Sequence, residues 1–422
     1  VVLANNNRLL KSSFIFGANA AGKSNFIHAV DFMRRIVISG DAKRGTSRDK
    51  YFRIDPECSK MPGVFQIELS VNEHFYSYGF SYDYISKAFQ AEWLYDITTE
   101  KEFCLFERDI ENKETKTDLD LSKNSIDKMR YEVYKSDISA DRLLLTEFAK
   151  KEIDESSVFS SFKDVYAWFL KIIVIYPNSR AGNINEFFVN DSGDNTLLAQ
   201  LLSDFDTGIE SISSKKTPLE ESLSFLSKDS REQVISAVDK TIHDNADLQS
   251  SLENGSRKTF GIENRRFVLS LENGNLMAEE LMMNHGNASD LFDLRDESDG
   301  TQRLFDLIPA YEVVKDGRVV LIDEIDRSFH SKLTEAYVRK FFELTEGNAC
   351  QMICTTHDLN LLTLNLLRQD EIWFAERTAE HSTQLYSLSE FKTRSDKSIL
   401  NDYVQGRYGA VPCILENDHE EG

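Results

Sequence analysis

The sequence predicts an α/β fold in which a core of parallel strands carries an antiparallel β lobe and helical insertions. Three observations lead to this prediction. A buried strand, a glycine-bounded loop and a helix follow one another between Lys11 and Val37. Alternating apolar residues from Val64 onward predict short strands joined by tight turns. After Arg303, helices alternate with buried strands, which is the pattern of a parallel sheet with crossover helices.

The first of these segments reads KSSFIFGANAAGKSNFIHAVDFMRRIV. Residues 12–16 are expected to form the strand, and the loop GANAAGKS runs from Gly17 through Gly22 to Ser24. The helix is expected over residues 25–37, with Phe26, Val30, Met33 and Val37 on one face. This order is the context of a phosphate-binding P-loop, in which backbone N–H groups and a helix N-terminus bind a polyphosphate. We therefore expect Lys23 to contact the β- and γ-phosphates and the Ser24 hydroxyl to hold Mg²⁺.

The next part of the chain is predicted to be an antiparallel meander beside the nucleotide core. Its expected strands are residues 64–71, 75–82, 89–97 and 102–108. Residues 119–170 have a helical and strongly charged pattern that is too short and irregular for a long coiled-coil arm. KIIVIY, at residues 171–176, is then a buried strand that ends at Pro177.

The second half of the chain is expected to begin with a helical block over residues 196–254 that forms a lid or subdomain. A β-hairpin around Asn273-Gly274 follows it. The remaining pattern predicts helices at residues 303–314, 331–346 and 358–367, and strands at residues 319–323, 351–355, 371–375 and 384–388.

Two carboxylates follow the apolar strand of VVLIDEID, at residues 319–326. They emerge at the carboxyl end of that strand, which is where α/β sheets bind ligands. Asp323 is expected to hold Mg²⁺ directly or through water, and Glu324 to polarise the attacking water. In isolation the pattern would fit a strand that ends in an acidic turn, but its place after a P-loop favours the catalytic interpretation.

Two further segments are candidates for contacts to the same phosphates. QMICTTHD, at residues 351–358, is a buried strand followed by His357, which we expect to sense the γ-phosphate rather than to be only structural. Ser298 and Gly300 lie at the start of a helix, which is an anion-binding position. A single P-loop does not need a second such helix, whereas two head-to-tail copies would each offer it to the other's γ-phosphate. Without a partner copy, Ser298 would be a plain helix cap.

The composition restricts the class of protein. The 422 residues include 49 basic and 71 acidic side chains, which gives a net charge of -22 and argues against a nucleic-acid-binding surface over the whole molecule. A local basic cluster follows the P-loop helix, although a solvated loop is the favoured interpretation; it comprises Lys43, Arg44, Arg48, Lys50 and Arg53. No apolar run approaches the length that spans a bilayer, and no signal peptide is recognisable.

The cysteines are five in number and scattered, which fits reduced thiols in a cytoplasmic protein. Cys350, Cys354 and His357 are close together, but the first two lie in an apolar strand and no second ligand pair accompanies them, so a metal site there is disfavoured. The chain begins with Val1 close to the P-loop strand, so we expect the natural N-terminus to be missing from this sequence. The acidic tail, residues 416–422, is expected to be disordered.

The order of these motifs resembles that of the ABC-type ATPase head of SMC proteins, RecF and the OLD-family ATPases. GANAAGKSN, with Asn19 and Asn25, is similar to the GxNxxGKSN loop of this branch. ESDGTQRLF, which contains Gln302, is similar to the shortened signature motif of bacterial OLD-like and RloA-like AAA-type ATPases. IDEIDRSFH resembles their Walker B motif and the loop that reaches the opposing subunit through Arg327 and Ser328. TTHDLNLL, DEIWFAE and GRYGAVP resemble their C-terminal pattern, so the resemblance extends from about residue 9 to residue 412.

The resemblance implies an ATPase that hydrolyses ATP with Mg²⁺ between two head-to-tail copies, or in a higher homo-oligomer. It implies that Gly17, Asn19, Gly22, Lys23, Ser24 and Asn25 bind the nucleotide of one copy, and that Ser298, Gly300 and Gln302 of the other copy complete the site. The implied domains are two parts of the head (1–115 and 256–415), helical insertions (116–170 and 196–255), a core strand and loop (171–195) and the tail (416–422). A glutamine that ABC heads commonly carry has no match in YPNSR, at residues 176–180, and the strand that usually precedes the P-loop is lacking.

The resemblance also implies a biological role, which is antiviral defence against phage through a toxic effector. OLD proteins carry a C-terminal nuclease domain, whereas this chain ends soon after GRYGAVP, so we expect the nuclease to be a separate partner protein. Three alternatives remain open. They are a DNA-repair or chromosome-maintenance ATPase of the RecF or SMC kind, the nucleotide-binding subunit of a transporter, and an ATP-dependent assembly scaffold with little turnover.

Overall fold

The computed structural model describes most of the chain as two compact units. The first unit comprises Val1–Val174, Gly317–Asp323 and Gly347–Gly422, and the second comprises Ile175–Asp316 and Glu324–Glu346. The described residues are 8–45, 51–122, 124–152, 154, 157–178, 196–255, 257–262, 265–314, 317–392 and 399–411. Arg48 and Lys50 of the basic cluster, the end of YPNSR, Cys413 and the acidic tail lie outside these residues.

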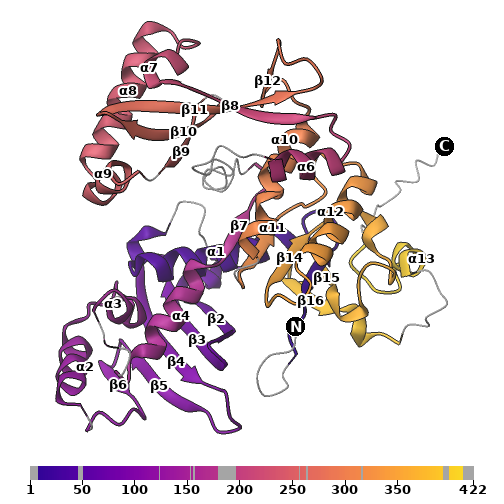
Figure 1. The fold of residues 1–422 in the computed structure, drawn as a ribbon. Coiled ribbons are helices and arrows are strands. Elements are labelled where there is room, and N and C mark those ends of the chain that lie inside the picture. Colours follow the sequence, from indigo (N-terminus) through magenta and orange to yellow (C-terminus); the bar gives the residue numbers. More distant parts are fainter. Residues whose placement is uncertain are drawn as a thin grey trace, which may run out of the picture. The chain divides into compact units, whose positions relative to one another are not determined.

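A six-stranded sheet forms the core of the first unit (Figure 1). Its order is β16-β15-β1-β14-β13-β7, from the strands Thr383–Ser387, Ile372–Arg377, Ser12–Phe16, Gln351–Thr355, Val319–Ile322 and Ile173–Ile175. The strand β1 runs parallel to both β14 and β15, and β13 runs parallel to β14, whereas β16 pairs antiparallel with β15. Phe14, Ile15 and Phe16 are almost fully buried, as expected for a central strand covered on both faces. The predicted parallel α/β core is confirmed, with an antiparallel strand at one edge.

The helix α1, Lys23–Ser39, starts two residues before the predicted helix and ends two residues after it. Its buried apolar side chains are Ile27, Phe32, Met33, Ile36 and Val37. Of the four apolar residues predicted to share a face, Met33 and Val37 are buried, and Phe26 and Val30 are half-buried. Gly40 ends the helix with a left-handed backbone (φ 71°), and its N–H donates to the Ile36 carbonyl oxygen.

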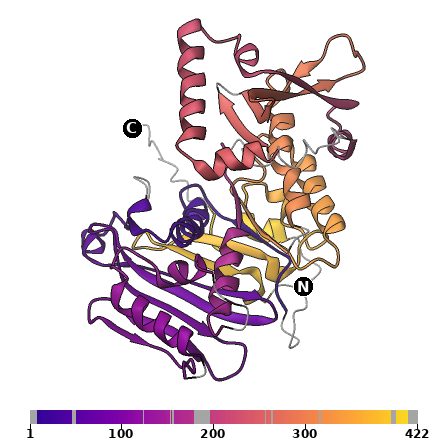
Figure 2. The same cartoon turned by 60° about the vertical axis from the view of Figure 1, so that its left-hand side comes forward.

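An antiparallel sheet of five strands in chain order confirms the predicted meander (Figure 2). Its strands are β2 (Gly63–Val71), β3 (His74–Asp83), β4 (Ala88–Asp96), β5 (Phe103–Asp109) and β6 (Glu114–Lys116). The helices α2 (Ser125–Asp137), α3 (Leu144–Ala149) and α4 (Ser160–Leu170) follow, as the charged helical pattern predicted. The single-turn 3₁₀ helices of this part are Ala42–Arg44 and Pro56–Lys60.

A buried carboxylate connects this meander to the P-loop helix. Glu92 on β4 is fully buried and accepts the N–H groups of Leu144 (2.7 Å) and Leu145 (3.1 Å) at the start of α3. Burial raises the pKa of Glu92, although the nearby Arg108 guanidinium and these N–H groups act in the opposite direction. One residue further along α3, the Thr146 hydroxyl donates to the Val37 carbonyl oxygen of α1 (2.6 Å). The far end of the P-loop helix is therefore fixed through hydrogen bonds to a buried polar network.

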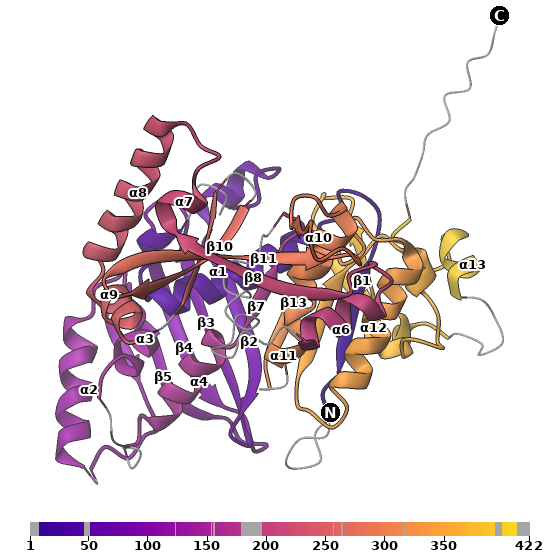
Figure 3. The ribbon, with the colours of Figure 1, turned by 45° about the horizontal axis from the view of Figure 1, so that its top comes forward.

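The second unit contains a small lobe with its own apolar core (Figure 3). Its elements are β8 (Ser211–Pro218), α7 (Leu219–Ser222), α8 (Lys228–His243), α9 (Ala246–Glu253), β9 (Lys258–Ile262), β10 (Arg265–Glu272), β11 (Asn275–Asn284) and β12 (Phe292–Asp293). The β10–β11 hairpin turns at Asn273-Gly274 as predicted, with both residues at positive φ. The apolar core of the lobe consists of Leu219, Leu223, Leu226, Phe267, Leu269 and Ala278.

The prediction of helix throughout residues 196–254 was wrong at β8. The helix α6 (Thr196–Asp204) and the helices α7, α8 and α9 are present, but Ser211–Pro218 pairs antiparallel with β11 along its whole length. The sequence SISSKKTP has few apolar residues, because this edge strand is largely exposed. A strand without an apolar face carries no alternation signal, and only its long-range pairing with β11 reveals it.

The second unit also contains α10 (Asp299–Leu307), α11 (Pro309–Val314) and α12 (Ser331–Leu344). The predicted helix over residues 303–314 is divided at Pro309, whose missing N–H and ring are incompatible with a helix interior. Tyr311 and Tyr337 connect α11 to α12, because the Tyr311 hydroxyl donates to the Tyr337 carbonyl oxygen and the Tyr337 hydroxyl donates to that of Leu307, both at 2.9 Å.

The predicted helix over residues 358–367 was also wrong. The structure has only a 3₁₀ turn, Leu359–Leu361, because the Asp358 carboxylate accepts the N–H of Asn360 (3.0 Å) and closes a local turn in competition with an α-helix. Two further 3₁₀ turns (Gln369–Glu371 and Leu388–Glu390) and the helix α13 (Ile399–Val404) complete this part. Among the described residues, no helix combines the length and the apolar character needed to cross a bilayer.

Candidate nucleotide-binding site

The P-loop connects β1 to α1 and has a backbone that glycine makes possible. Gly17 (φ 152°) and Gly22 (φ 95°) both have positive φ, and there is no room for a β-carbon at either position. The Ala375 backbone occupies that space at Gly17, and the Thr383 side chain occupies it at Gly22. The helix begins at Lys23, so its first N–H groups have no intrahelical acceptor and are available to an anion. The predicted ligands Asn19 and Asn25 both have exposed side chains, on the loop and on the first helical turn.

Lys23 is buried and folds back over the loop. Its Nζ donates to the carbonyl oxygens of Gly17 (2.8 Å) and Ala18 (3.1 Å), and its exposed fraction is only 6%. A buried ammonium group next to a glycine-rich loop gives the site a fixed positive charge. That charge is suited to the β- and γ-phosphates of a nucleotide.

Ser24 and Asp323 lie together, although 299 positions separate them in the sequence. The Ser24 hydroxyl donates to Asp323 Oδ1 at 3.0 Å, and the Thr355 hydroxyl donates to the same oxygen at 2.6 Å. The order of strands in the sheet explains why they meet, because β1, β14 and β13 are consecutive and parallel. Thr355 ends β14, Asp323 follows β13, and Ser24 follows the loop that leaves β1. Thr355 is a site residue that sequence reasoning missed; its place at the end of a buried strand beside the Asp-Glu strand was the available signal.

These oxygen donors fit Mg²⁺. A carboxylate with an exposed fraction of 3% and a hydroxyl form a hard-oxygen pair beside the loop. The described residues contain no group of three or more His, Cys, Asp or Glu side chains that could hold a metal ion alone. Mg²⁺ commonly takes one or two protein ligands and completes its coordination shell with waters and substrate phosphates, so the pair Ser24 and Asp323 is a suitable donor set.

His357 follows β14 by two residues and has an exposed side chain. The preceding residue, Thr356, is fully buried, and its N–H donates to the Ile15 carbonyl oxygen at 3.1 Å. This main-chain bond joins the segment that carries His357 to the strand that enters the P-loop. The imidazole is therefore presented from a fixed backbone at the carboxyl edge of the sheet.

Glu324 begins the segment Glu324–Glu346 of the second unit. Its backbone is left-handed, with φ of 50°. A non-glycine residue in this region is uncommon and is held there by its surroundings. Its carboxylate lies 3.7 Å from the Arg327 guanidinium, and its carbonyl oxygen accepts a weak bond from Arg303 (3.5 Å). Arg303, which is 4% exposed, also donates to the Tyr176 carbonyl oxygen at 2.9 Å. Sequence reasoning did not single out Arg303, although it belongs to the DGTQR motif.

The predicted signature residues lie at the start of α10, in the second unit. The Ser298 hydroxyl accepts the N–H of Thr301 (3.1 Å) and is therefore the N-cap of the helix. A β-carbon on Gly300 would lie 3.1 Å from the Ser328 carbonyl oxygen, so the loop after Glu324 passes close to this glycine. The Gln302 side-chain amide donates to the Glu297 carbonyl oxygen (2.8 Å).

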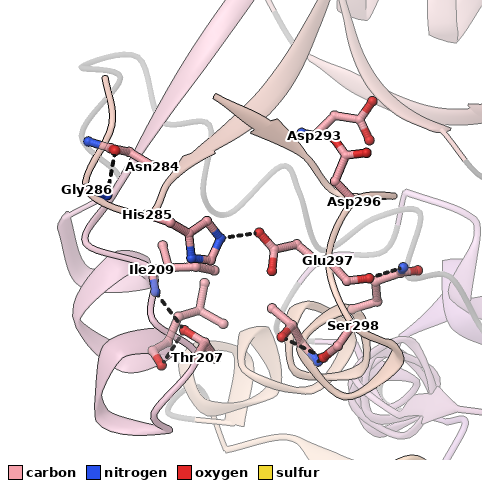
Figure 4. Close-up of polar contacts among 12 residues, drawn as sticks. Thr207, Ile209, Asn284, His285, Gly286, Asp293, Asp296, Glu297 and Ser298 are labelled. Carbon is pink, nitrogen blue, oxygen red and sulfur yellow. Dashed lines mark hydrogen bonds and ion pairs between the residues drawn. The ribbon is translucent and has the colours of Figure 1, made fainter. Parts of the chain in front are cut away.

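An ion pair precedes this helix start, and sequence reasoning missed it. His285 Nε2 lies 2.7 Å from Glu297 Oε1, and Figure 4 shows the imidazole ring of His285 directed at that carboxylate. Glu297 immediately precedes the N-cap Ser298, and His285 immediately follows β11. The pair therefore connects the end of the lobe's long strand to the N-terminus of α10.

A cavity of about 260 Å³ lies elsewhere in the first unit. Its lining includes Leu9, Trp168, Val319 and Gln351. Val319 and Gln351 are the first residues of β13 and β14, so the cavity is at the amino ends of these strands and not at the P-loop.

Several solved structures are similar to this chain. They include an Smc head bound to the C-terminal winged-helix domain of ScpA, with 13% identity over 89% of both chains and a TM-score of 0.39. The SMC head domain from Thermotoga maritima has 9% identity over 89% of this chain and 90% of its own, with a TM-score of 0.34. An Smc head with an extended coiled coil, bound to the C-terminal domain of ScpA derived from Pyrococcus furiosus, has 14% identity over 90% of both chains and a TM-score of 0.32. These scores are too low to establish a common fold.

No curated protein matches the chain. A family model does match it. The family described as "AAA domain, putative AbiEii toxin, Type IV TA system" matches residues 12–363, which begin at the P-loop strand and extend beyond the His357 segment. Most of the chain, including every predicted site residue, lies within that match. The chain therefore belongs to this family of AAA domains.

Proposed function

We propose that the protein binds and hydrolyses ATP with Mg²⁺, and that two head-to-tail copies form each complete site. The meeting of Ser24, Asp323 and Thr355 beside the P-loop carries this proposal. A hydroxyl from the P-loop and a buried carboxylate from a neighbouring strand are the two protein groups that hold Mg²⁺ in P-loop nucleotidases. Membership of an AAA family agrees with this assignment.

In the proposed reaction, a water oxygen attacks the γ-phosphorus and the bond from that phosphorus to the β–γ bridging oxygen breaks. Lys23 and the N–H groups of the Gly17–Ser24 loop hold the phosphates, with Asn19 and Asn25 at its exposed edge. Glu324 orients the water and accepts its proton, and His357 contacts the γ-phosphate. Ser24 and Asp323 would hold Mg²⁺, which when bound would supply positive charge to the phosphate oxygens.

The second copy would supply Ser298, Gly300 and Gln302 to the γ-phosphate of the first. The N-terminus of α10 has the free N–H groups that favour an anion, and Ser298 begins it. Hydrolysis would then open the assembly and ATP would close it, which is a two-state element that can hold or release a partner.

For the biological role, we propose control of a separate toxic effector, such as a nuclease, in bacterial phage defence inside the cytoplasm. The description of the matching family names a toxin and a toxin–antitoxin system, which is compatible with such a role. Effector identity requires its own experiment, such as purification of the complex from the native host.

The deciding experiment uses the full chain, two test variants and one control variant. We expect Lys23→Ala to lose ATP binding, and Glu324→Gln to bind ATP while its turnover falls roughly 100-fold, because the variant lacks the base. Lys60→Ala is the matched control for the loss of a positive charge, because Lys60 is an exposed lysine that pairs with Glu57. Binding is measured by calorimetry, turnover by phosphate release, and mass by sedimentation with and without ATP.

The two parts of the proposal can fail separately. Turnover of Glu324→Gln at the parent rate would remove Glu324 from the role of base. A mass that does not respond to ATP in the parent or in Glu324→Gln would contradict the head-to-tail site. ATP-driven association without any turnover in the parent would instead indicate a scaffold.

A further inference from the structure

Two C-terminal segments that the sequence singled out have no role in the reaction proposed above. They are DEIWFAE, which forms most of β15, and GRYGAVP, which follows α13. Both belong to the first unit, as does the P-loop. Their described residues, up to Val411, contact one another and the loop through several hydrogen bonds.

The turn at Gly409-Ala410 has a left-handed backbone that side chains hold in place. Both residues have positive φ, 69° at Gly409 and 56° at Ala410. The Ala410 N–H donates to Glu376 Oε1 (3.3 Å). The Tyr386 hydroxyl has two acceptors, Glu376 Oε2 at 3.0 Å and the Tyr408 carbonyl oxygen at 2.6 Å. Burial raises the pKa of Tyr386, and Glu376 adds to the shift, so the hydroxyl keeps its proton at neutral pH.

This turn presents a carbonyl group to the P-loop. The Ala410 oxygen accepts the N–H of Ala18 and the hydroxyl of Tyr403, each at 2.9 Å. Ala410 is 4% exposed and Tyr403 is 4% exposed, so water does not compete for these bonds. The P-loop also packs against β15. Ala21 of the loop, Ala375 of β15 and Ile15 of β1 form one buried cluster.

The connection continues from Ala18 to the functional lysine. The peptide group whose N–H bonds to Ala410 is that between Gly17 and Ala18, and its carbonyl oxygen belongs to Gly17. That oxygen is one of the two that accept Lys23 Nζ, at 2.8 Å. Because a peptide group is planar, fixing the direction of its N–H also fixes the direction of its carbonyl oxygen.

We propose that Glu376, Tyr386, Gly409 and Ala410, here named the C-terminal brace, are positioning residues that set the nucleotide affinity of the P-loop. The brace fixes the Gly17–Ala18 peptide and so keeps the Lys23 ammonium in place before the nucleotide arrives. A loop that is already ordered loses less conformational freedom on binding, so the brace strengthens ATP and ADP binding without taking part in the chemistry. This inference rests on the proposed nucleotide function of the same site.

The test compares two tyrosine variants of the full chain. Tyr386→Phe removes only the hydroxyl of the brace. Tyr95→Phe is the matched control, because the Tyr95 hydroxyl also donates to a glutamate (Glu107 Oε2, 2.6 Å) in the first unit but belongs to the β4–β5 strand pair. We expect Tyr386→Phe to raise the dissociation constants of Mg-ATP and of ADP by roughly threefold to tenfold, the effect of one lost hydrogen bond. Tyr95→Phe is expected to leave both constants unchanged.

Three readouts separate positioning from simple packing. The KM for ATP should rise with the dissociation constant, whereas kcat at saturating ATP should stay within about twofold of the parent. Melting temperatures of the two variants should be similar, since each loses one tyrosine–glutamate bond. Glu376→Gln, which keeps an acceptor oxygen, should weaken binding less than Glu376→Ala. Unchanged dissociation constants in both Tyr386→Phe and Glu376→Ala would overturn the proposal and leave the brace a packing feature.

Failure of this inference and failure of the proposed function give different results. A parent that binds ATP through Lys23 but does not hydrolyse it contradicts the proposed reaction, and the brace is still tested through the dissociation constants. A parent that hydrolyses ATP and whose Tyr386→Phe and Glu376→Ala variants both bind ATP as tightly as the parent contradicts the brace alone. A parent that binds no nucleotide contradicts both.

Discussion

The P-loop and the start of α10 are both candidate phosphate-binding helix N-termini, but they are held in different ways. The P-loop is fixed by main-chain bonds: Ala18 to Ala410 on the loop, and Thr356 to Ile15 on the strand that enters it. The start of α10 is fixed by side chains, through the His285–Glu297 pair and the Ser298 cap. The strength of a main-chain bond does not depend on the protonation of a side chain, whereas a histidine–carboxylate contact is an ion pair only when the histidine is protonated.

This difference fits different roles for the P-loop and for the start of α10. A nucleotide loop benefits from being rigid before the ligand arrives. In the head-to-tail assembly proposed above, the helix α10 would change partners during the cycle, and a side-chain contact to a separate lobe would allow that change. Substitutions at four places test this difference, in order of decreasing expected effect.

Asp323→Ala tests the P-loop side most severely. It removes the acceptor of both the Ser24 and the Thr355 hydroxyls, together with one of the two side chains proposed to hold Mg²⁺. We expect ATP turnover to fall roughly 100-fold to 1,000-fold, because the charge on the transferred phosphate would be poorly neutralised. Phosphate release measured over a Mg²⁺ titration checks this. A full recovery at high Mg²⁺ would limit the role of Asp323 to metal affinity, and an unchanged rate would contradict its assignment.

Gly409→Ala tests whether the brace depends on its backbone. A β-carbon at Gly409 would lie 2.6 Å from the Tyr386 hydroxyl oxygen, at a φ of 69°. Gly255→Ala is the control, since its φ is 86° and nothing lies within 4 Å of the added carbon. We expect Gly409→Ala to lower the free energy of unfolding by about 3 kcal/mol and Gly255→Ala by about 1 kcal/mol. Urea unfolding measures both, and equal losses would show that the contact with Tyr386 has no cost.

Glu297→Gln and His285→Gln test the α10 side. Either change weakens the contact between the end of β11 and the start of α10. We expect ATP-driven association to weaken by about tenfold while the dissociation constant of ATP for the monomer stays unchanged. Sedimentation at several protein concentrations measures the first quantity and calorimetry the second. Lys216→Ala, which breaks an exposed ion pair with Glu272 in the same lobe, is the control. A loss of monomer affinity for ATP would contradict the separation of the two regions.

The smallest expected effect concerns an exposed ion pair beyond the far end of α1. Lys43 lies 2.6 Å from the Asp141 carboxylate, and this hydrogen bond, with a second one from Ser139, lowers the pKa of Asp141 from 3.8 to about 2. A lowered carboxyl pKa stabilises the fold above the unfolded value, and that stability is lost as the pH falls from about 4 toward 2. Because the pair is on the surface, we expect only a small contribution to the free energy of unfolding. Asp141→Asn should flatten the pH dependence of unfolding in that window, and an identical profile would show that the pair contributes nothing.

Local patterns predicted several elements well. Ser12–Phe16 and Gln351–Thr355 have the predicted bounds, because continuous apolar strands in a parallel core have a strong signal. The Asn273-Gly274 hairpin was equally predictable from its turn residues. The exposed strand β8 has no such signal, and the segment after His357 has helix-like spacing that the Asp358 turn overrides.

The candidate site was predictable in its residue types and not in its contacts. The glycines, Lys23, Ser24 and the acidic pair of VVLIDEID follow from motif spacing. Sequence reasoning missed Thr355, Arg303 and the His285–Glu297 pair. Thr355 had a positional signal at the end of a buried strand, and Arg303 lies in the DGTQR motif. The His285–Glu297 contact joins two residues whose meeting depends on the fold.

The sequence by itself determined the P-loop and its neighbouring strand and helix, since these depend on residues within a few positions of one another. It also determined the net charge of -22 and the apolar strands that build the core. Only the tertiary structure decided which distant residues meet. Ser24 contacts Asp323 and Ala18 contacts Ala410 because of the order in which strands join the sheet and the turn that follows α13. Strand order depends on the packing of the whole core, so no local stretch of sequence contains it.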